Sequence, residues 1–233
     1  MKICTSPQGS IQWLEDRAGV ITASMFFECR KRLKSGPNKG DFTVSARQYA
    51  FKLACERISG SLLDDVKFDT WQMKRGRELE SDARFEHEFR KGILVEQAGF
   101  VISDNGLYGA SVDGLINHNG NSEYKCFVSP LSLMPILLDG DISSCIDQVQ
   151  GGMWITEREY CDFCLYCPAL ENIGRDLEIF TIYRDQEYID GLERGLAEFN
   201  DLVEHYRKTL TNHHSGSSAN DSSDENKLNI GAA

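Results

Sequence analysis

The chain has 233 residues, enough for one substantial hydrophobic core but not for two. Hydrophobic residues make up 41% of it and charged residues 26%, the balance of an ordinary globular protein. Because no apolar run is long enough to span a bilayer and no signal peptide opens the chain, we expect a cytoplasmic protein with no membrane partner.

Charge is unevenly distributed along the chain. Taken alone, the net charge of −11 argues against a nucleic-acid partner. Residues 1–60, however, hold ten Lys or Arg and five Asp or Glu, a net of +5, so the remainder carries −11 − 5 = −16. Five of the cations fall within ten positions: Arg30, Lys31, Arg32, Lys34 and Lys39. They form either a solvated helix end and loop, or an arm through which Lys34 and its neighbours contact DNA phosphates.

The first predicted elements are mainly helical. Residues 13–24 are expected to form a short segment and a turn that lead into a helix, with Thr22 or Ser24 as its N-cap. Amphipathic patterns predict helices over residues 45–58 and 70–90, and a glycine follows each of them as a stop signal.

The second half of the domain alternates between strands and helices. Short apolar stretches predict strands, and amphipathic stretches predict helices, in this order: strands 95–102, 108–116 and 122–127, helices 130–138 and 142–156, strands 160–167 and 177–183, and a helix over 186–209. This order predicts one mixed α/β domain over residues 1–210. Residues 211–233 are polar and of low complexity, and we expect a disordered tail there.

One predicted hairpin carries candidate chemistry. Asp113 lies on its first strand, Asn117-His118-Asn119-Gly120 form the turn, and Glu123 and Lys125 lie on its second strand. Since side chains alternate along a strand, Glu123 and Lys125 point to one face, which pairing brings beside Asp113. Two carboxylates and an ammonium suit phosphodiester hydrolysis. The carboxylates would hold Mg²⁺, and the lysine would orient water and stabilise charge on the phosphorane.

By itself this pattern is weak, because acidic and basic residues often alternate on an exposed strand. Two features favour a site. Asp113 stands in an apolar strand, where an unpaired carboxylate is costly. Lys125 is bracketed by Tyr124, Cys126 and Phe127.

Further motifs reveal a resemblance to a known family. The segments WLEDRAGVITAS, RGRELESDAR, GASVDGL, EYKC and DQVQGGMWIT occur in the order found in lambda exonuclease-like, YqaJ-type viral recombination nucleases of the PD-(D/E)XK superfamily. The resemblance spans most of residues 10–205 and implies a restriction-endonuclease-like α/β core, a central mixed β-sheet flanked by helices. One departure is that Val112 stands where the family usually has proline before the catalytic Asp. That residue shapes the strand and binds no metal.

The resemblance also implies roles for individual residues. The metal would be Mg²⁺, for which Mn²⁺ can substitute, and its ligands would be Asp113, Glu123, Glu80 and the backbone carbonyl of Tyr124. Lys125 would be the catalytic lysine, and Gln148 would place the water or Lys125. From the residues alone, two alternatives stay open: Glu80 pairs with Arg77 or Arg84 at helical spacing, and Gln148 only makes hydrogen bonds at a helix surface.

The family resemblance further implies an activity. Such nucleases degrade one strand of duplex DNA from a 5′-phosphorylated end, in the 5′-to-3′ direction, and leave 3′ overhangs for recombination. Arg17, Ser24 and Ser111 match its phosphate pocket, and Met73 matches an apolar residue that helps separate the strands. For Arg17 an ion pair with an acidic neighbour is the alternative. A ring-shaped homotrimer, a single-strand annealing partner and a phage or prophage origin in a bacterial cytoplasm are likewise implied.

The eight cysteines are expected to be free thiols. Cys161, Cys164 and Cys167 have the spacing of an iron–sulfur motif, with Cys145 as a distant fourth ligand. A strand there would place Cys164 on the face opposite Cys161 and Cys167, which favours buried thiols over a shared cluster.

Three other functions compete with the exonuclease. They are an endonuclease, an iron–sulfur end-trimming nuclease, and a non-catalytic DNA-binding module on the same fold.

Overall fold

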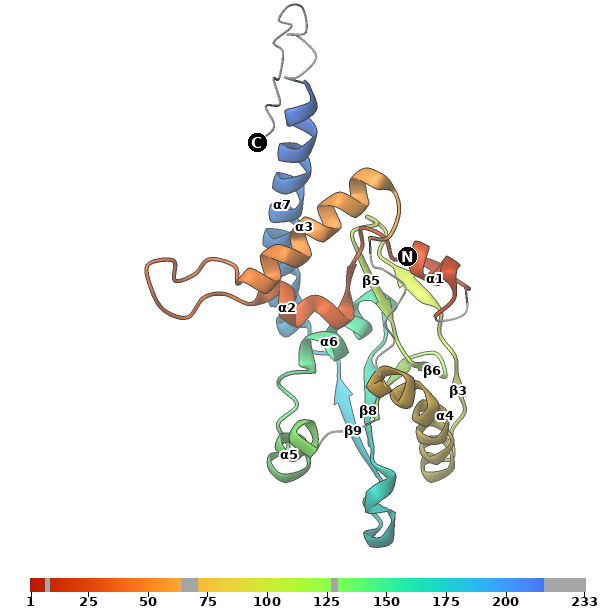
Figure 1. The fold of residues 1–233 in the computed structure, drawn as a ribbon. Coiled ribbons are helices and arrows are strands. Elements are labelled where there is room, and N and C mark those ends of the chain that lie inside the picture. The colour runs from red at the N-terminus through yellow and green to blue at the C-terminus, as the bar shows by residue number, and fades with distance from the viewer. Residues whose placement is uncertain (7–8, 64–70, 127–129, 216–233) are drawn as a thin grey trace, which may run out of the picture.

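The structure is a computed structural model that describes residues 1–6, 9–63, 71–126 and 130–215. It contains two β-sheets with helices packed around them (Figure 1). The smaller sheet has the strand order β1 (Lys2–Cys4), β4 (Phe100–Ile102), β5 (Tyr108–Ser111) and β2 (Ile21–Thr22). The larger sheet has the order β3 (Val95–Glu96), β6 (Gly114–Ile116), β7 (Gly120–Cys126), β8 (Tyr160–Tyr166) and β9 (Leu177–Tyr183). Both sheets mix parallel and antiparallel pairs.

The helices follow the predicted order. They are α1 (Ile11–Glu15), α2 (Phe26–Arg30), α3 (Val44–Ser59), α4 (Trp71–Lys91), α5 (Pro130–Asp139), α6 (Ile146–Thr156) and α7 (Gln186–Ser215), with short 3₁₀ turns η1 (Ala23–Met25) and η2 (Pro168–Ile173). The predicted helices over 45–58 and 70–90 are confirmed as α3 and α4. Gly60 ends α3 in the left-handed conformation, at φ +69°. Thr22 precedes η1 without a side-chain capping bond.

The prediction of one strand over residues 108–116 is wrong. β5 ends at Ser111 and pairs within the smaller sheet, whereas β6 begins at Gly114 and pairs with β7 in the larger one. Asp113 therefore occupies the bend where the chain changes sheets. Glycine at position 114 allows Val95 of β3 to pack closely against this bend, because a Cβ on Gly114 would lie only 2.1 Å from Cγ1 of Val95. The expected strand over 95–102 is likewise divided between the two sheets, as β3 and β4.

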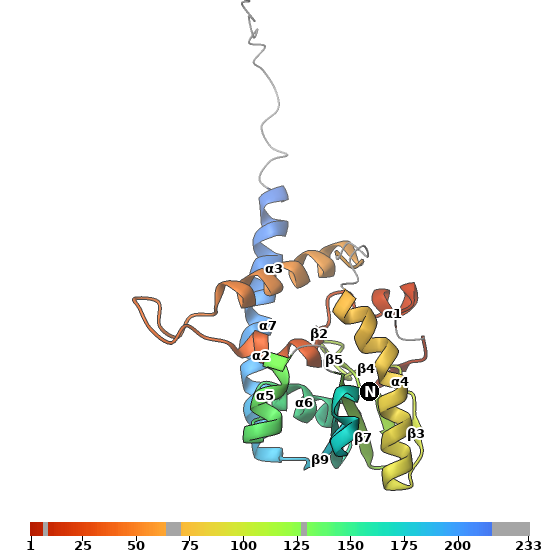
Figure 2. The ribbon, with the colours of Figure 1, turned by 60° about the horizontal axis from the view of Figure 1, so that its bottom comes forward.

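Helices cover both faces of the larger sheet (Figure 2). On one face, α4 packs Leu79 and Ala83 against Tyr124 and Cys164. On the other, residues of α5 and α6 pack against Cys161 and its neighbours on β8. Successive residues of β7 and β8 thus point to different helices, as the two-residue period of a strand requires.

The remaining core lies between the smaller sheet and helices α2, α3, α6 and α7, with Phe26, Leu53, Leu192 and Phe199 almost fully buried in it. α7 runs to Ser215, beyond the predicted helix end at 209, so its last turns enter the segment expected to be a tail. Residues 216–233 lie outside the described part of the chain. Within the described residues, no helix is both long and apolar enough to span a membrane.

Candidate active site

Asp113 stands at the centre of the candidate site. Its backbone amide donates to the Ser122 carbonyl at 3.1 Å, and its Oδ2 accepts the Tyr124 amide at 2.8 Å. Burial raises the pKa of Asp113 well above its usual range, and the negative charges of Glu123 and Glu80 raise it further. Three carboxylates therefore concentrate negative charge at this bend, which favours a cation there.

Glu123, Lys125 and Gln148 form a compact triangle beside that bend. Lys125 Nζ donates to Glu123 Oε1 at 2.7 Å and to Gln148 Oε1 at 3.0 Å, and Gln148 Nε2 donates to the same Glu123 oxygen at 2.5 Å. Burial opposes the charge of Lys125, but the Glu123 carboxylate outweighs burial and raises the lysine pKa. Glu123 and Lys125 share one face of β7, as expected, and Gln148 points to them from α6.

Glu80 reaches this region from α4 together with Arg84. Arg84 Nη2 donates to Glu80 Oε1 at 2.8 Å and to the Asp113 carbonyl at 3.2 Å. The Arg84 guanidinium also lies 5.9 Å from the centre of the Tyr124 ring. The helical ion pair that was the alternative for Glu80 does form, and the same arginine joins that acid to the bend. A cavity of about 350 Å³ opens here, lined by Arg84, Asp113 and residues near Thr5 and Gln97.

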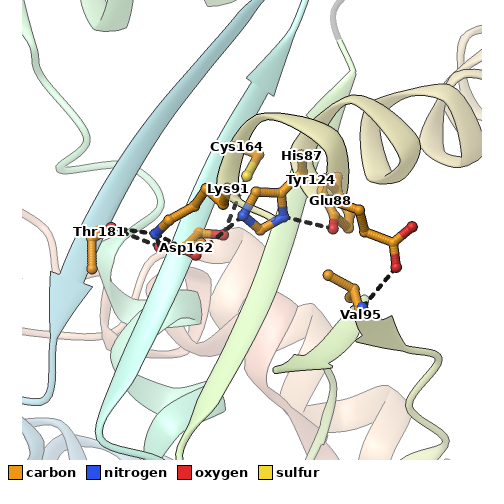
Figure 3. A network of polar contacts seen from close by, with 8 residues as sticks. All are labelled: His87, Glu88, Lys91, Val95, Tyr124, Asp162, Cys164 and Thr181. Atoms are coloured by element: carbon orange, nitrogen blue, oxygen red, sulfur yellow. Dashed lines mark hydrogen bonds and ion pairs between the residues drawn. The ribbon is translucent and has the colours of Figure 1, made fainter. Parts of the chain in front are cut away.

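Three further polar residues of α4 were not expected at the site, and of these Arg84 was expected only as an ion-pair partner of Glu80. Arg84, His87 and Lys91 follow Glu80 at spacings of four, three and four, so they form one stripe that faces the sheet. His87 is fully buried between Tyr124 and Asp162 (Figure 3). The sequence signal that could have revealed these residues is their helical spacing, which places them on the face of α4 next to the buried Leu79 and Ala83.

Asp162 on β8 is the hub of the network behind the site. It accepts from His87 Nε2 at 3.1 Å, from Lys91 Nζ at 2.9 Å on each oxygen, and from Thr181 Oγ1 at 2.6 Å (Figure 3). Burial opposes its charge, but these donors together lower the pKa of Asp162 to about 2. An ionised carboxylate only accepts, so Nε2 of His87 carries a proton.

The residues expected to bind a 5′-phosphate are partly brought together. Arg17 Nη1 donates to Ser111 Oγ at 3.1 Å, and its guanidinium stacks on the Trp13 ring at 4.2 Å. Ser24 is exposed, and its hydroxyl lies 3.4 Å from that of Thr22.

Two other predicted DNA contacts lie outside this group. Lys34 is exposed and lines a cavity of about 690 Å³ together with Phe27 and Tyr188. The side chain of Met73 lies outside the described residues.

The oxygens of Asp113, Glu123, Glu80 and the Tyr124 carbonyl are hard ligands of the kind that Mg²⁺ prefers, and the raised pKa of Asp113 fits a site where a cation would favour the ionised carboxylate. Among the described residues, however, no three His, Cys, Asp or Glu side chains lie close enough together to hold one metal ion. In the present geometry Lys125 neutralises Glu123 instead.

All eight cysteines are free thiols, as expected. Cys161 and Cys164 pack on opposite faces of the larger sheet, in separate hydrophobic clusters. Buried thiols therefore account for this segment, and its geometry opposes a shared iron–sulfur cluster.

Comparison with known proteins identifies the family. Residues 12–159, well over half of the chain, match the YqaJ-like viral recombinase domain. The chain belongs to this family. The comparison with curated proteins found no match.

Solved structures agree with the family. An alkaline exonuclease, LHK-Exo from Laribacter hongkongensis, is 26% identical over 89% of this chain and 99% of its own, with a TM-score of 0.74. Its complex with dAMP gives a TM-score of 0.76 at the same identity and coverage. A phage-related exonuclease from Haemophilus somnus 129PT, 19% identical over 84% of this chain and 96% of its own, shares the fold with a TM-score of 0.62. The YqaJ-type resemblance and the PD-(D/E)XK-like α/β fold are thus confirmed, and the chain is an exonuclease-like member of this nuclease family.

Proposed function

We propose that the protein is a Mg²⁺-dependent 5′-to-3′ exonuclease that acts on 5′-phosphorylated ends of double-stranded DNA and leaves 3′ overhangs for recombination. The observation that carries the proposal is the triangle of Lys125, Glu123 and Gln148 beside the Asp113 bend, in a chain of the YqaJ-like family. The triangle supplies a carboxylate, an ammonium and an amide within hydrogen-bonding distance of one another.

The carboxylates of Asp113, Glu123 and Glu80 and the carbonyl of Tyr124 would hold the cation, Mg²⁺ or in its place Mn²⁺. When bound, the cation supplies positive charge that polarises the scissile phosphate and promotes ionisation of water. Glu123, which pairs with Lys125 in the structure, would then serve as a ligand, and the Lys125 ammonium would be available to the substrate.

The chain's own groups do the rest. Lys125, held in its charged form and aimed by Gln148, orients the attacking water and stabilises the negative charge that develops on the phosphorane. The half-buried setting strengthens both effects, because charges interact more strongly where water is partly excluded. Arg84 keeps the Asp113 carbonyl and the Glu80 carboxylate in fixed relation to each other.

Selection of a phosphorylated end falls to Arg17, Ser111 and Ser24. Arg17 and Ser111 are already in contact, and both offer donors suited to phosphate oxygens. Ser111 lies two residues before Asp113, so a phosphate bound there sits at the beginning of the bend that carries the reaction. Lys34 and its basic neighbours would contact the duplex backbone, and Met73 would help separate the strands.

The family supports the remaining parts of the proposal. A homotrimeric ring would enclose the duplex and make the enzyme processive, and a single-strand annealing protein would receive the exposed 3′ strand. The protein would act in the cytoplasm of a bacterium that carries the phage or prophage.

Digestion of linear and covalently closed circular duplexes tests this function. With Mg²⁺ the protein should release mononucleotides from the linear DNA and leave the closed circle intact, and a chelator should stop the release. Cutting of the closed circle would identify an endonuclease instead. Binding without any release at saturating Mg²⁺ would identify a non-catalytic module.

A further inference from the structure

We propose that His87 is a positioning residue, which acts through Tyr124 to fix the part of β7 that presents Glu123 and Lys125. The inference rests on the proposed function and names a determinant of it that lies on the other side of the sheet. None of the motifs that indicate the family assigns a role to His87, Asp162 or the Tyr124 hydroxyl.

The need for such a support lies in the pairing of β7. Within the described residues, β6 pairs with β7 only over Gly120–Ser122, whereas β8 pairs with it over all of Gly120–Cys126. The stretch that holds Glu123 and Lys125 is therefore hydrogen-bonded to a neighbouring strand on one side only. A strand edge of this kind opens more easily than a strand paired on both sides.

Tyr124 joins the two faces of this stretch. Its backbone amide donates to the Asp113 carboxylate at 2.8 Å, which occupies the open edge of β7. Its side chain points the other way, into the layer between the sheet and α4, where its hydroxyl lies 3.0 Å from His87 Nδ1 (Figure 3). The two catalytic neighbours of Tyr124 necessarily point to the opposite face.

Other residues of the network hold His87 in place. It is fully buried, and its Nε2 is 3.1 Å from Asp162, which Lys91 and Thr181 also bind. α4 is itself tied to the larger sheet through Glu88, whose carboxylate accepts the Val95 amide at 2.7 Å (Figure 3). Displacement of Tyr124 would thus leave a buried nitrogen of the His87 ring without a hydrogen bond. The free-energy cost of that loss disfavours movement of β7.

Packing alone does not account for this arrangement. The surrounding layer is apolar, with Leu79, Ala83 and Cys164 in it, and apolar side chains in place of both His87 and Tyr124 would fill the space without a buried polar pair. A hydrogen bond to the Tyr124 hydroxyl fixes the orientation of that side chain, whereas apolar contacts do not. Outer-shell partners of this type affect a metal site through the groups they hold, by about 10- to 100-fold.

The test uses the full chain with Tyr124→Phe, which deletes only the hydroxyl, and His87→Gln. Tyr166→Phe is the matched control, because Tyr166 belongs to the same hydrophobic cluster but not to the network. Hydrogen exchange of the β7 amides is measured without DNA or metal. Tyr124→Phe and His87→Gln should each speed exchange at residues 123–126 about tenfold and leave β9 unchanged. Tyr166→Phe should leave both as in the parent.

Activity and Mn²⁺ binding give the functional readouts. Both network variants should lower kcat about 10- to 100-fold with KM for the duplex unchanged, and should weaken Mn²⁺ binding by a similar factor. Parent-like exchange at residues 123–126, or an equal loss in Tyr166→Phe, would overturn the proposal. If the parent protein itself releases no nucleotides, the proposed function fails, while the exchange data still decide whether His87 positions β7.

Discussion

The ammonium nitrogen of Lys125 on β7 lies 3.0 Å from the side-chain oxygen of Gln148 on α6, and both side chains bind Glu123 Oε1. Two residues that are 23 positions apart in the sequence, one on a strand and one on a helix, thereby meet at one carboxylate oxygen. Besides Glu123, Lys125 thus has a second partner, Gln148, which would still aim the ammonium if Glu123 bound a cation.

Replacement of Lys125 should abolish cleavage. In Lys125→Ala we expect nucleotide release to fall by about 100-fold or more, because the charge that stabilises the phosphorane is lost, while duplex binding stays near the parent value. Single-turnover rates and a binding titration measure the two effects. Lys208→Ala, at an exposed position of α7, is the control. A Lys125→Ala variant that cuts at the parent rate would refute the mechanism.

Arg84 should be needed as an arginine. Arg84→Lys keeps the charge but loses the planar fork that reaches Glu80 and the Asp113 carbonyl together. We expect kcat to fall by about 10- to 100-fold with little change in duplex affinity. Arg75→Lys is the matched control, since Arg75 forms an exposed pair with Glu78 on the same helix. Equal rates in the two variants would contradict a positioning role for Arg84.

Arg17 should determine the preference for phosphorylated ends. In Arg17→Ala the ratio of initial rates on 5′-phosphate and 5′-hydroxyl ends should fall by about 10- to 100-fold, the worth of a charge-assisted hydrogen bond. Arg47→Ala, exposed on α3, should keep the parent ratio. If Arg17→Ala slowed both substrates equally, Arg17 would have a structural role in its contact with Ser111 instead.

Asp162 should make the free energy of unfolding depend on pH in the acidic range. Its pKa of about 2 in the folded state lies below the ordinary 3.8, so the unfolded chain takes up the proton first as the pH falls. The ionised group therefore contributes about 2 kcal/mol above pH 5, and this contribution is lost between about pH 4 and pH 2. Urea unfolding of the parent and Asp162→Asn across this range measures it. The two free-energy curves should converge on acidification, and parallel curves would contradict the assignment.

Local pattern was enough to predict some of the site. The two-residue period of β7 placed Glu123 and Lys125 on one face, and the strand at Cys161 and Cys164 divided those thiols between faces. Glycine stop signals fixed the ends of α3 and α4. These features depend only on residues close in the sequence.

Long-range contacts explain what the sequence did not reveal. The bend at Asp113 arises because β5 and β6 find partners in different sheets, which no local propensity encodes. No local pattern indicated a role for His87, because its partner Asp162 is 75 residues away in the sequence. Arg84 looked like an ordinary helical partner for Glu80, and its bond to Asp113 spans 29 residues.

The central claim is tested most directly by linear duplexes that differ only in the 5′-phosphate and in which strand end is labelled. With Mg²⁺ present, a 5′ label should appear at once as mononucleotide, a 3′ label should stay in long fragments, and ends without phosphate should be degraded more slowly. Early release of the 3′ label, or equal rates with and without the phosphate, would contradict a 5′-to-3′ exonuclease that selects phosphorylated ends.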